Sequence, residues 1–362
     1  MIVVSPILKR VVYPALANSG YLRRRAHGGA FCTLTYHGVL PAGYEVTDPQ
    51  HDGCLVTAEN FRSQLRLLKE IYNVVSPGDV QEWIVGGKEL PERAILLTCD
   101  DGLCNGLTEM APILVDEGLT CLFFVLGLSA SGEPGSLWYE DLYSLIVAAP
   151  AGGYWFESPA LTVELADAAQ RRTVWWELVK RLSGYDQEFR ENFVEAARSQ
   201  FGLSDGRYQR SFRGRSFERA FEDDAQWRRF GILNAQQLRQ LVAMGMEVGS
   251  HTMSHPVLSQ LPSELAWQEI AESRTALEKA LGKPMWALAY PYGDAEAVTA
   301  REMQMAEQAG YECAFMNIGG GFGAALPRFG LPRVHVSMEM NLAEFEAHVS
   351  GFHREFRAKL AG

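Results

Sequence analysis

A unit that recurs along the chain constrains the fold more than any other feature. A helix-period segment ends near a glycine, and a β-rich run follows almost at once. Glycine after a last helical turn adopts the left-handed conformation that ends a helix. The clearest copies have their glycines at Gly118, Gly245, Gly282 and Gly310. With the other apolar runs, the predicted strands are 31–36, 73–76, 94–99, 119–126, 246–250, 284–290, 311–316 and 331–336.

Strands that alternate with helices predict parallel βαβ units, and eight of them favour a closed (β/α) barrel. Several of the runs are apolar without alternation, which is typical of strands buried on both faces. An open doubly wound sheet is the alternative, but the glycine-rich phosphate fingerprint of dinucleotide-binding folds is missing. We therefore expect an α/β protein built on a barrel.

One long segment departs from this pattern. Residues 138–225 contain no clear strand, only helix-like stretches such as 161–182 and 187–201. A connection of this length must carry structure of its own. The predicted organisation is an N-terminal segment over 1–30, a barrel formed by 31–137 and 226–362, and a helical insertion over 138–225.

The net charge and the cysteines indicate which binding partners and which cellular compartment to expect. The formal net charge of −11 argues against nucleic acid or an anionic membrane as the main partner. Six cysteines without a CxxC pair favour buried free thiols in a reducing compartment. No run reaches the roughly 18 apolar residues of a membrane span, and the first residues lack the features of an export signal. We expect a cytoplasmic protein, with peripheral membrane contact through the apolar, basic-flanked segment 2–16 left open.

Several polar residues lie at the C-terminal ends of the predicted strands, where the following loops begin. In a parallel barrel this edge carries the active site. The residues at these strand ends are His37, Asp100, Asp101, His251, His255, Tyr292 and His335. Their coincidence at one edge is stronger support for a site than any single motif.

Two imidazoles and a carboxylate from this edge suit a catalytic divalent metal. Zinc is the first choice, with ferrous iron, cobalt and nickel as alternatives. Of two adjacent acids, one can be a ligand while the other takes the proton of a water whose pKa the metal lowers. The chain has no Gly-x-Ser-x-Gly elbow. This set therefore indicates amide hydrolysis without a protein nucleophile.

Three motifs, in order, resemble those of the polysaccharide deacetylases, the family with the NodB-homology domain. Thr98-Cys99-Asp100-Asp101-Gly102 is similar to the first motif, Thr-Phe-Asp-Asp-Gly. The segment 250–255 is similar to the second, His-Ser/Thr-x-x-His, and 289–293 has the Ala-Tyr-Pro-Tyr-Gly form of the third. The resemblance covers about residues 30–137 and 226–340.

The resemblance implies a role for each matching residue. Asp100 corresponds to the catalytic base, and Asp101, His251 and His255 correspond to the metal ligands. The backbone N–H of Tyr292 corresponds to the group that holds the oxyanion. The family's barrel is often distorted or incomplete, which leaves seven or eight strands. The expected substrate is an N-acetylated sugar in a polysaccharide or glycolipid precursor.

The chain also departs from the family pattern. Ala289 stands where many members have an arginine that orients the catalytic acid, and Arg328 and Arg333 are the candidates to replace it. His335 is the nearest match to the proton-donating histidine of a late Leu-x-His motif, the alternative being a histidine satisfied within its strand. The candidate substrate contacts are His37, Trp138, Tyr139 and Arg333, with aromatic core as the alternative for Trp138 and Tyr139.

Two other functions remain open at this stage. A catalytically inactive, carbohydrate-binding protein on the same barrel would explain the missing arginine. A deformylase or cyclic amidase would use the same metal site on a different substrate.

Overall fold

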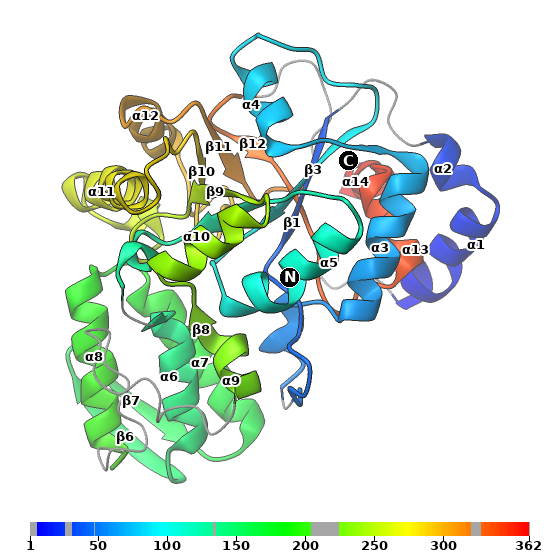
Figure 1. Cartoon of the computed structure of the whole chain (residues 1–362). Coiled ribbons are helices and arrows are strands. Elements are labelled where there is room, and N and C mark those ends of the chain that lie inside the picture. Colours follow the sequence, from blue (N-terminus) through cyan, green and yellow to red (C-terminus); the bar gives the residue numbers. More distant parts are fainter. Residues whose placement is uncertain are drawn as a thin grey trace.

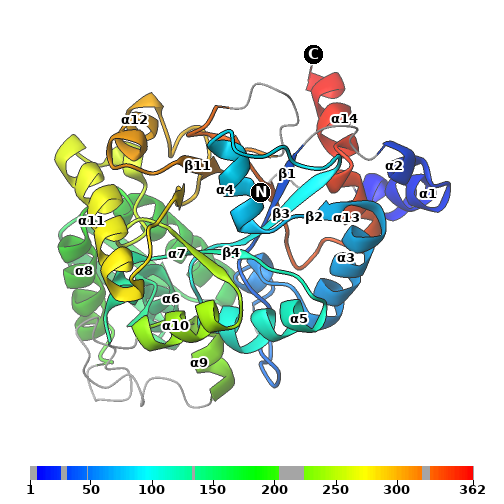
Figure 2. The same cartoon turned by 45° about the horizontal axis from the view of Figure 1, so that its top comes forward.

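The computed structural model describes residues 6–25, 31–46, 48–132, 135–203, 224–319 and 327–361. A parallel sheet lies at its centre and nearly closes into a barrel with helices around it (Figure 1 and Figure 2). The barrel strands are β1 (Cys32–Tyr36), β2 (Asn73–Val74), β3 (Ala94–Cys99), β4 (Leu122–Val125), β9 (Glu247–Ser250), β10 (Ala287–Ala289), β11 (Cys313–Met316), β12 (Leu331–Pro332) and β13 (Val334–His335). The predicted barrel fold is confirmed.

The ladder of this sheet runs β12-β11-β10-β9-β4-β3-β1-β13, with β2 paired to β3. Its two ends, β12 and β13, are consecutive in the sequence and are separated by Arg333 alone. The predicted strand 331–336 is therefore two short strands: β12 pairs with β11, and β13 pairs with β1. This interrupted strand brings the two ends of the barrel together.

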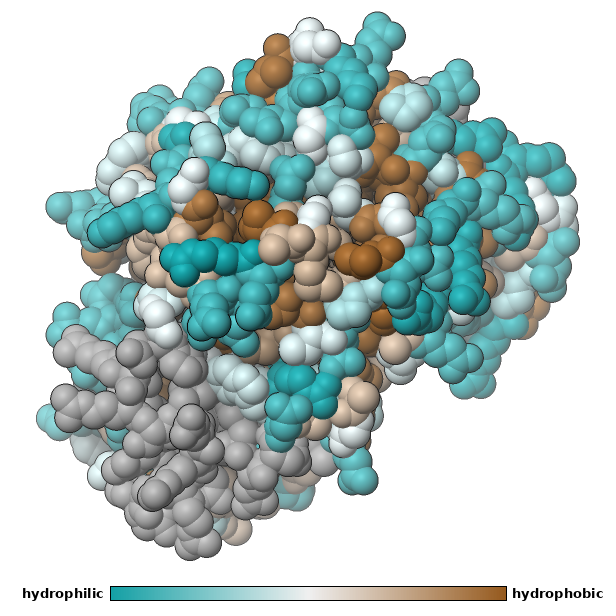
Figure 3. Space-filling model, viewed as in Figure 1, coloured by the Kyte–Doolittle hydropathy of each residue, from teal (hydrophilic) through white to brown (hydrophobic). Residues whose placement is uncertain are grey.

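The barrel strands are apolar because both of their faces are buried. All six residues of β3 are buried, and its neighbouring side chains alternate between two hydrophobic clusters. Ile95 and Leu97 belong to the larger cluster, whereas Leu96 packs with Phe124 and Phe315 in the other. The period of two is that of a strand whose successive side chains point to opposite faces. On the face drawn in Figure 3, apolar residues lie in small patches on a mostly hydrophilic surface.

The helices of the barrel begin and end at recognisable signals. They are α3 (Ala58–Ile71), α4 (Pro77–Ile84), α5 (Ala111–Asp116), α10 (Ala235–Ala243), α11 (Ser263–Leu281), α12 (Ala300–Gln308), α13 (Leu342–Val349) and α14 (Phe352–Ala361). Thr57, Asn234 and Asn341 are N-cap residues whose side chains accept hydrogen bonds from the first helical turn. Pro262 is the N-cap of α11 and makes no such hydrogen bond. Gly282 ends α11 with a φ of 66°.

The insertion is built from both helices and strands. The elements of this segment and its immediate flanks are β5 (Gly135–Ser136), α6 (Trp138–Ala148), β6 (Gly152–Glu157), β7 (Ala160–Leu165), α7 (Ala168–Leu182), α8 (Gln187–Gln200), α9 (Asp224–Phe230) and β8 (Gly231–Ile232). The expectation of a segment without strands is corrected by the antiparallel pair β6–β7. The insertion has its own hydrophobic cluster, which includes Leu142, Phe156 and Phe193. Residues 204–223 lie outside the described part of the chain.

Short helices near the N-terminus pack beside the last helices of the chain (Figure 1 and Figure 2). Tyr13 and Leu22, from α1 (Tyr13–Asn18) and α2 (Tyr21–Arg25), are buried against Ala347 of α13. The remaining short helical turns are η1 (Leu8–Val12), η2 (Asp52–Cys54), η3 (Gly106–Met110), η4 (Gly127–Ala130) and η6 (Leu258–Gln260). Among the described residues, no helix combines the length and hydrophobicity needed to cross a bilayer.

Candidate active site

The candidate residues lie at the carboxyl ends of the barrel strands. Asp100 and Asp101 follow β3, and His251 follows β9. Tyr292 lies in the turn after β10, while His37 directly follows β1 and His335 ends β13. These strands lie close together in the sheet, where only β4 separates β9 from β3, so the ladder brings together residues that are up to about 300 positions apart in the sequence.

Asp101, His251 and His255 form a buried cluster. The Oδ1 atom of Asp101 lies 3.4 Å from Nε2 of His251 and 3.3 Å from Nε2 of His255. One potential ligand atom from each residue lies within 4.8 Å of the others. All three side chains are buried. The structure therefore brings together the three residues that the sequence predicted as metal ligands.

The backbone around this cluster adopts uncommon conformations. Asp101, His255 and Tyr292 have φ values of 71°, 64° and 59°, in the left-handed region. Residues other than glycine rarely adopt this region, at a cost of order 1–3 kcal/mol each. Gly102 follows with a φ of 66°, and a Cβ there would lie 3.0 Å from the Val125 side chain. Three strained residues in one site indicate that the surrounding contacts hold them in place.

Hydrogen bonding fixes the orientation of His251. Its Nδ1 lies 2.7 Å from the carbonyl oxygen of Ala289, and because a carbonyl only accepts, Nδ1 carries the proton. The other ring nitrogen, Nε2, is left to face Asp101 with its lone pair. This arrangement is the usual way in which a metal-binding histidine is oriented.

The cluster meets a test of its fit to a divalent metal. Oδ1 of Asp101 is buried and has no hydrogen-bond partner among the described residues. A buried acceptor without a partner is costly unless something else satisfies it. One carboxylate and two imidazoles with further positions open are the donor set of catalytic zinc and related metals. The residues present therefore fit such an ion.

Asp100 is held by an arginine from the opposite end of the sequence. Two guanidinium nitrogens of Arg333 each donate a hydrogen bond of 2.6 Å to a different carboxylate oxygen of Asp100. One of them also donates to Thr98 Oγ1 at 3.3 Å. Arg333 is fully buried. Of the two candidates for the missing arginine, the geometry selects Arg333, because Arg328 instead donates to the carbonyl oxygen of Glu312.

Burial and these neighbours shift the pKa values in the site. Burial raises the pKa of Asp100, but Arg333 and His251 outweigh it and hold the pKa below its usual range. Burial also raises the pKa of Asp101, and the adjacent His251 and His255 rings lower it well below the usual value. Both carboxyl groups are therefore ionised near neutral pH.

His37 and His335 lie next to each other, with ring centroids 5.0 Å apart. Both are partly exposed, and their Nδ1 atoms have no partner in the described part of the chain. Burial and His37 lower the pKa of His335 to about 3, against the opposing effect of Asp100. His335 is therefore neutral before any proton transfer.

The two predicted aromatic contacts differ in their surroundings. The Tyr139 ring is partly exposed, lies 5.3 Å from the His255 ring, and its hydroxyl donates to Asp101 Oδ2 at 3.5 Å. Trp138 is only 2% exposed and packs in the hydrophobic cluster of the insertion, with the Arg190 guanidinium 5.3 Å above its ring. Both faces of its ring are covered by protein, so Trp138 is a core residue, which was the alternative to a sugar contact.

The insertion also reaches the site through residues that the sequence analysis did not single out. The Ser183 hydroxyl, at the end of α7, shares a hydrogen bond of 3.1 Å with the Tyr292 hydroxyl. Arg190 of α8 contacts Ser254, which directly precedes His255. An arginine on the apolar face of an amphipathic helix was the available signal, but its partner lies 64 positions away.

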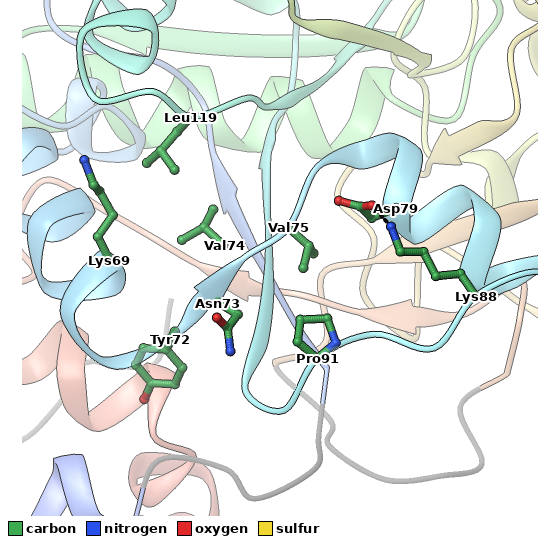
Figure 4. Close-up of a pocket in the computed structure, with 9 residues that line it drawn as sticks. All are labelled: Lys69, Tyr72, Asn73, Val74, Val75, Asp79, Lys88, Pro91 and Leu119. Carbon is green, nitrogen blue, oxygen red and sulfur yellow. Dashed lines mark hydrogen bonds and ion pairs between the residues drawn. The ribbon is translucent and has the colours of Figure 1, made fainter.

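A cavity of about 540 Å³ lies elsewhere, beside the start of the barrel (Figure 4). Its lining residues include Asn73 and Val74 of β2 and Lys69 at the end of α3. Lys69 binds Glu117, and Lys88 binds Asp79. The amino ends of the strands lie here, whereas the residues with hydrolytic chemistry lie at the carboxyl ends.

Comparisons with known proteins agree with this arrangement. Residues 217–314 match the sequence model of a family described as polysaccharide deacetylase. A stretch of 117 residues is 25% identical to YxkH of Bacillus subtilis, whose name assigns it provisionally to the polysaccharide deacetylases. This match covers 32% of the chain and 41% of the length of that relative. The segment matched by the family contains His251 and His255 but not Asp100 and Asp101.

Solved structures with the same fold cover most of the chain. The Streptococcus pyogenes deacetylase PplD in complex with acetate aligns with a TM-score of 0.53 at 16% identity, over 89% of this chain and 99% of that one. IcaB from Ammonifex degensii aligns with a TM-score of 0.52 at 18% identity, over 90% and 98%. At these identities the likeness concerns the fold. The resemblance that the sequence motifs indicated is confirmed.

Proposed function

We propose that the chain is a metal-dependent hydrolase of the polysaccharide deacetylase kind, which removes the acetyl group from an N-acetylated sugar. The observation that carries the proposal is the buried cluster of Asp101, His251 and His255 beside an ionised Asp100. The expected substrate is a glycan or glycolipid precursor with N-acetyl groups. The cytoplasmic location and the peripheral membrane contact through segment 2–16 stay predictions.

In this proposal Asp101, His251 and His255 hold the metal, with zinc as the first choice and cobalt, nickel or ferrous iron as alternatives. When bound, a divalent metal supplies Lewis acidity to the amide carbonyl and lowers the pKa of an attacking water. The cluster supplies only three protein donor atoms, so positions stay open for substrate and water, as in catalytic rather than structural sites.

Asp100 takes the proton of the attacking water. Its pKa is low, so it is ionised and ready to accept. Arg333 fixes both carboxylate oxygens, which restricts the base to one orientation. We propose this positioning role for Arg333 in place of the predicted substrate contact, because both of its terminal nitrogens bind Asp100 and its side chain is fully buried.

The remaining groups act on the acetyl group and the sugar. The Tyr292 backbone N–H is the proposed donor to the oxyanion, in a turn held by the left-handed conformation of that residue. His335 is the proposed proton donor to the leaving amine and must first receive a proton, since it starts neutral. Tyr139 and His37 are the proposed sugar contacts, because both are partly exposed beside the cluster.

The test is product analysis on purified protein reconstituted with zinc. N-acetylated and N-formylated sugar oligomers are incubated separately, and acetate and formate are measured. The proposal expects acetate release that Asp100→Asn abolishes and that Glu188→Gln, an exposed change on α8, leaves intact. Formate release alone would favour the deformylase. Sugar binding without either product would favour the inactive carbohydrate-binding protein.

A further inference from the structure

We propose that the insertion completes the metal centre and that Arg190 is a positioning residue for the loop that carries His255. This inference rests on the proposed metal site, and it assigns a role to α8, which lies outside the region that the family model matches. The insertion would then be more than an addition to the surface of the barrel, because the geometry of a ligand would depend on it.

Arg190 binds two polar groups of one loop residue, Ser254. It lies on α8, is 1% exposed, and donates to the Ser254 carbonyl oxygen at 3.2 Å and to the Ser254 hydroxyl oxygen at 2.6 Å. Glu269 of α11 completes the group: its Oε2 accepts from the Ser254 backbone N–H at 2.8 Å, and its Oε1 lies 3.9 Å from Arg190. The loop residue is therefore held from the insertion on one side and from the barrel on the other.

The held residue directly precedes a ligand that is in an unfavourable backbone conformation. His255 has a φ of 64°, and Thr252 in the same loop has a φ of 65°. Such conformations persist only where the surroundings determine them. Because Ser254 is fixed through its carbonyl, its hydroxyl and its N–H, the peptide leading into His255 has little freedom to turn away.

A second contact from the insertion holds the same loop on the far side of His255. The backbone N–H of Val257 donates to the Ser183 carbonyl oxygen at 3.0 Å. Ser183 also binds the Tyr292 hydroxyl through its side chain. The insertion thus contacts residues 254 and 257, and His255 lies between these two points. Two separate contacts, one on each side of His255, can hold this ligand in position.

An arginine is well suited to this task. Its guanidinium carries several donors in a fixed plane, so one side chain can satisfy two acceptors in a defined relative orientation. A role in core stability alone is the competing explanation, since Arg190 also lies over the Trp138 ring. That explanation predicts a less stable protein whose remaining folded molecules bind metal normally.

The experiment is a metal titration of the full chain after removal of metal. Arg190→Met is compared with Arg198→Met, the same change two turns later on α8, where the arginine is also buried but pairs with Glu195 at 3.3 Å. Removing a partner that orients a ligand typically weakens metal binding about 10–100-fold. We expect a loss of this size for Arg190→Met and wild-type affinity for Arg198→Met. The visible spectrum of the cobalt form should change only in Arg190→Met.

Several outcomes would overturn the inference. Wild-type metal affinity and an unchanged cobalt spectrum in Arg190→Met would show that the loop carrying His255 keeps its conformation without Arg190. If Arg190→Met does not fold, Ser254→Ala removes the hydroxyl acceptor at the cost of one atom, and unchanged affinity there would have the same meaning. Failure of the wild type to bind metal would instead remove the proposed function, and the inference with it.

Discussion

The guanidinium of Arg333 donates two hydrogen bonds of 2.6 Å to the carboxylate of Asp100, and both side chains are buried. Arg333 occupies the single position between β12 and β13, where the strand that closes the barrel is interrupted. The residue that interrupts this strand is therefore the same residue that orients the proposed base. In our proposal Arg333 takes the place of the arginine that is missing from the third motif.

Replacing Arg333 with lysine should reduce kcat about 100-fold while the metal content stays near wild type. A lysine ammonium lacks the planar pair of donors that holds both oxygens of a carboxylate. Steady-state kinetics and elemental analysis check the two halves of this prediction. A raised KM with unchanged kcat would instead indicate that Arg333 binds substrate.

Replacing Arg333 with methionine, which removes the positive charge that lysine would keep, should move the acidic limb of the pH profile. Arg333 holds the pKa of Asp100 down against burial, so its loss lets burial raise that pKa. A base with a raised pKa is protonated at higher pH, and activity should therefore be lost at a higher pH than in the wild type. An unchanged acidic limb in kcat/KM would contradict the assignment of Asp100 as the base.

Replacing His335 with glutamine should affect amides and activated esters differently. An amine must be protonated as it leaves, whereas a nitrophenolate leaves without a proton, and general acid catalysis contributes about 10²–10⁴-fold. We expect a loss in this range for N-acetyl sugar and little change for 4-nitrophenyl acetate. Equal losses on both substrates would indicate a structural histidine, the alternative left open by the sequence.

The two neighbouring aromatic residues should respond in opposite ways to truncation. Trp138→Ala removes a buried side chain and should lower the free energy of unfolding by about 3–5 kcal/mol. Tyr139→Ala removes a partly exposed ring beside His255 and should mainly raise KM. Chemical denaturation and sugar kinetics distinguish them. A stable Trp138→Ala protein with a raised KM would restore Trp138 as a sugar contact.

Glu140 should make the protein sensitive to acid. It binds His51 at 2.6 Å and Arg229 at 3.1 Å, and Arg229 also binds Asp52, so the cluster joins α6 and α9 to a barrel loop. Against the effect of burial, Arg229 and His51 lower the pKa of Glu140 to about 2. A depressed pKa contributes stability above the unfolded value near 4.5 that is lost as the pH falls toward 2.

This shift corresponds to a loss of roughly 2 kcal/mol between pH 6 and pH 3. Glu140→Gln should flatten the dependence of the unfolding free energy on pH by about that amount, while Glu188→Gln on the exposed face of α8 should not. Urea denaturation at a series of pH values measures both. Parallel curves for wild type and Glu140→Gln would contradict the prediction.

The barrel and the metal cluster could be predicted because local patterns encode them. Strands buried on both faces are continuous apolar runs, and the polar residues that follow them meet at one edge. The antiparallel pair β6–β7 was missed although Phe156, Val163 and Leu165 alternate with exposed residues. Only two strands are involved, and neighbouring glycines weaken the pattern.

The partners of the long buried side chains could not be predicted in the same way. Arg333 and Asp100 are 233 positions apart, and nothing in either local segment identifies the other. In the sequence, Arg190 is one charged residue among several in an amphipathic helix, and nothing near it indicates the contact with Ser254. Such pairs depend on how the sheet closes and how the insertion docks. Trp138 illustrates the same point, since an aromatic residue in the core and one that stacks on sugar look alike in sequence.

The amount of metal bound to the purified protein is the most direct test of the proposed metal centre. Elemental analysis should find about one divalent ion per chain in the wild type, loss of the ion in His255→Ala, and retention in Asp100→Asn, which should be inactive. This pattern would separate the ligands from the base. A reconstituted wild type that binds no divalent ion, or that binds it equally well in His255→Ala, would contradict the account.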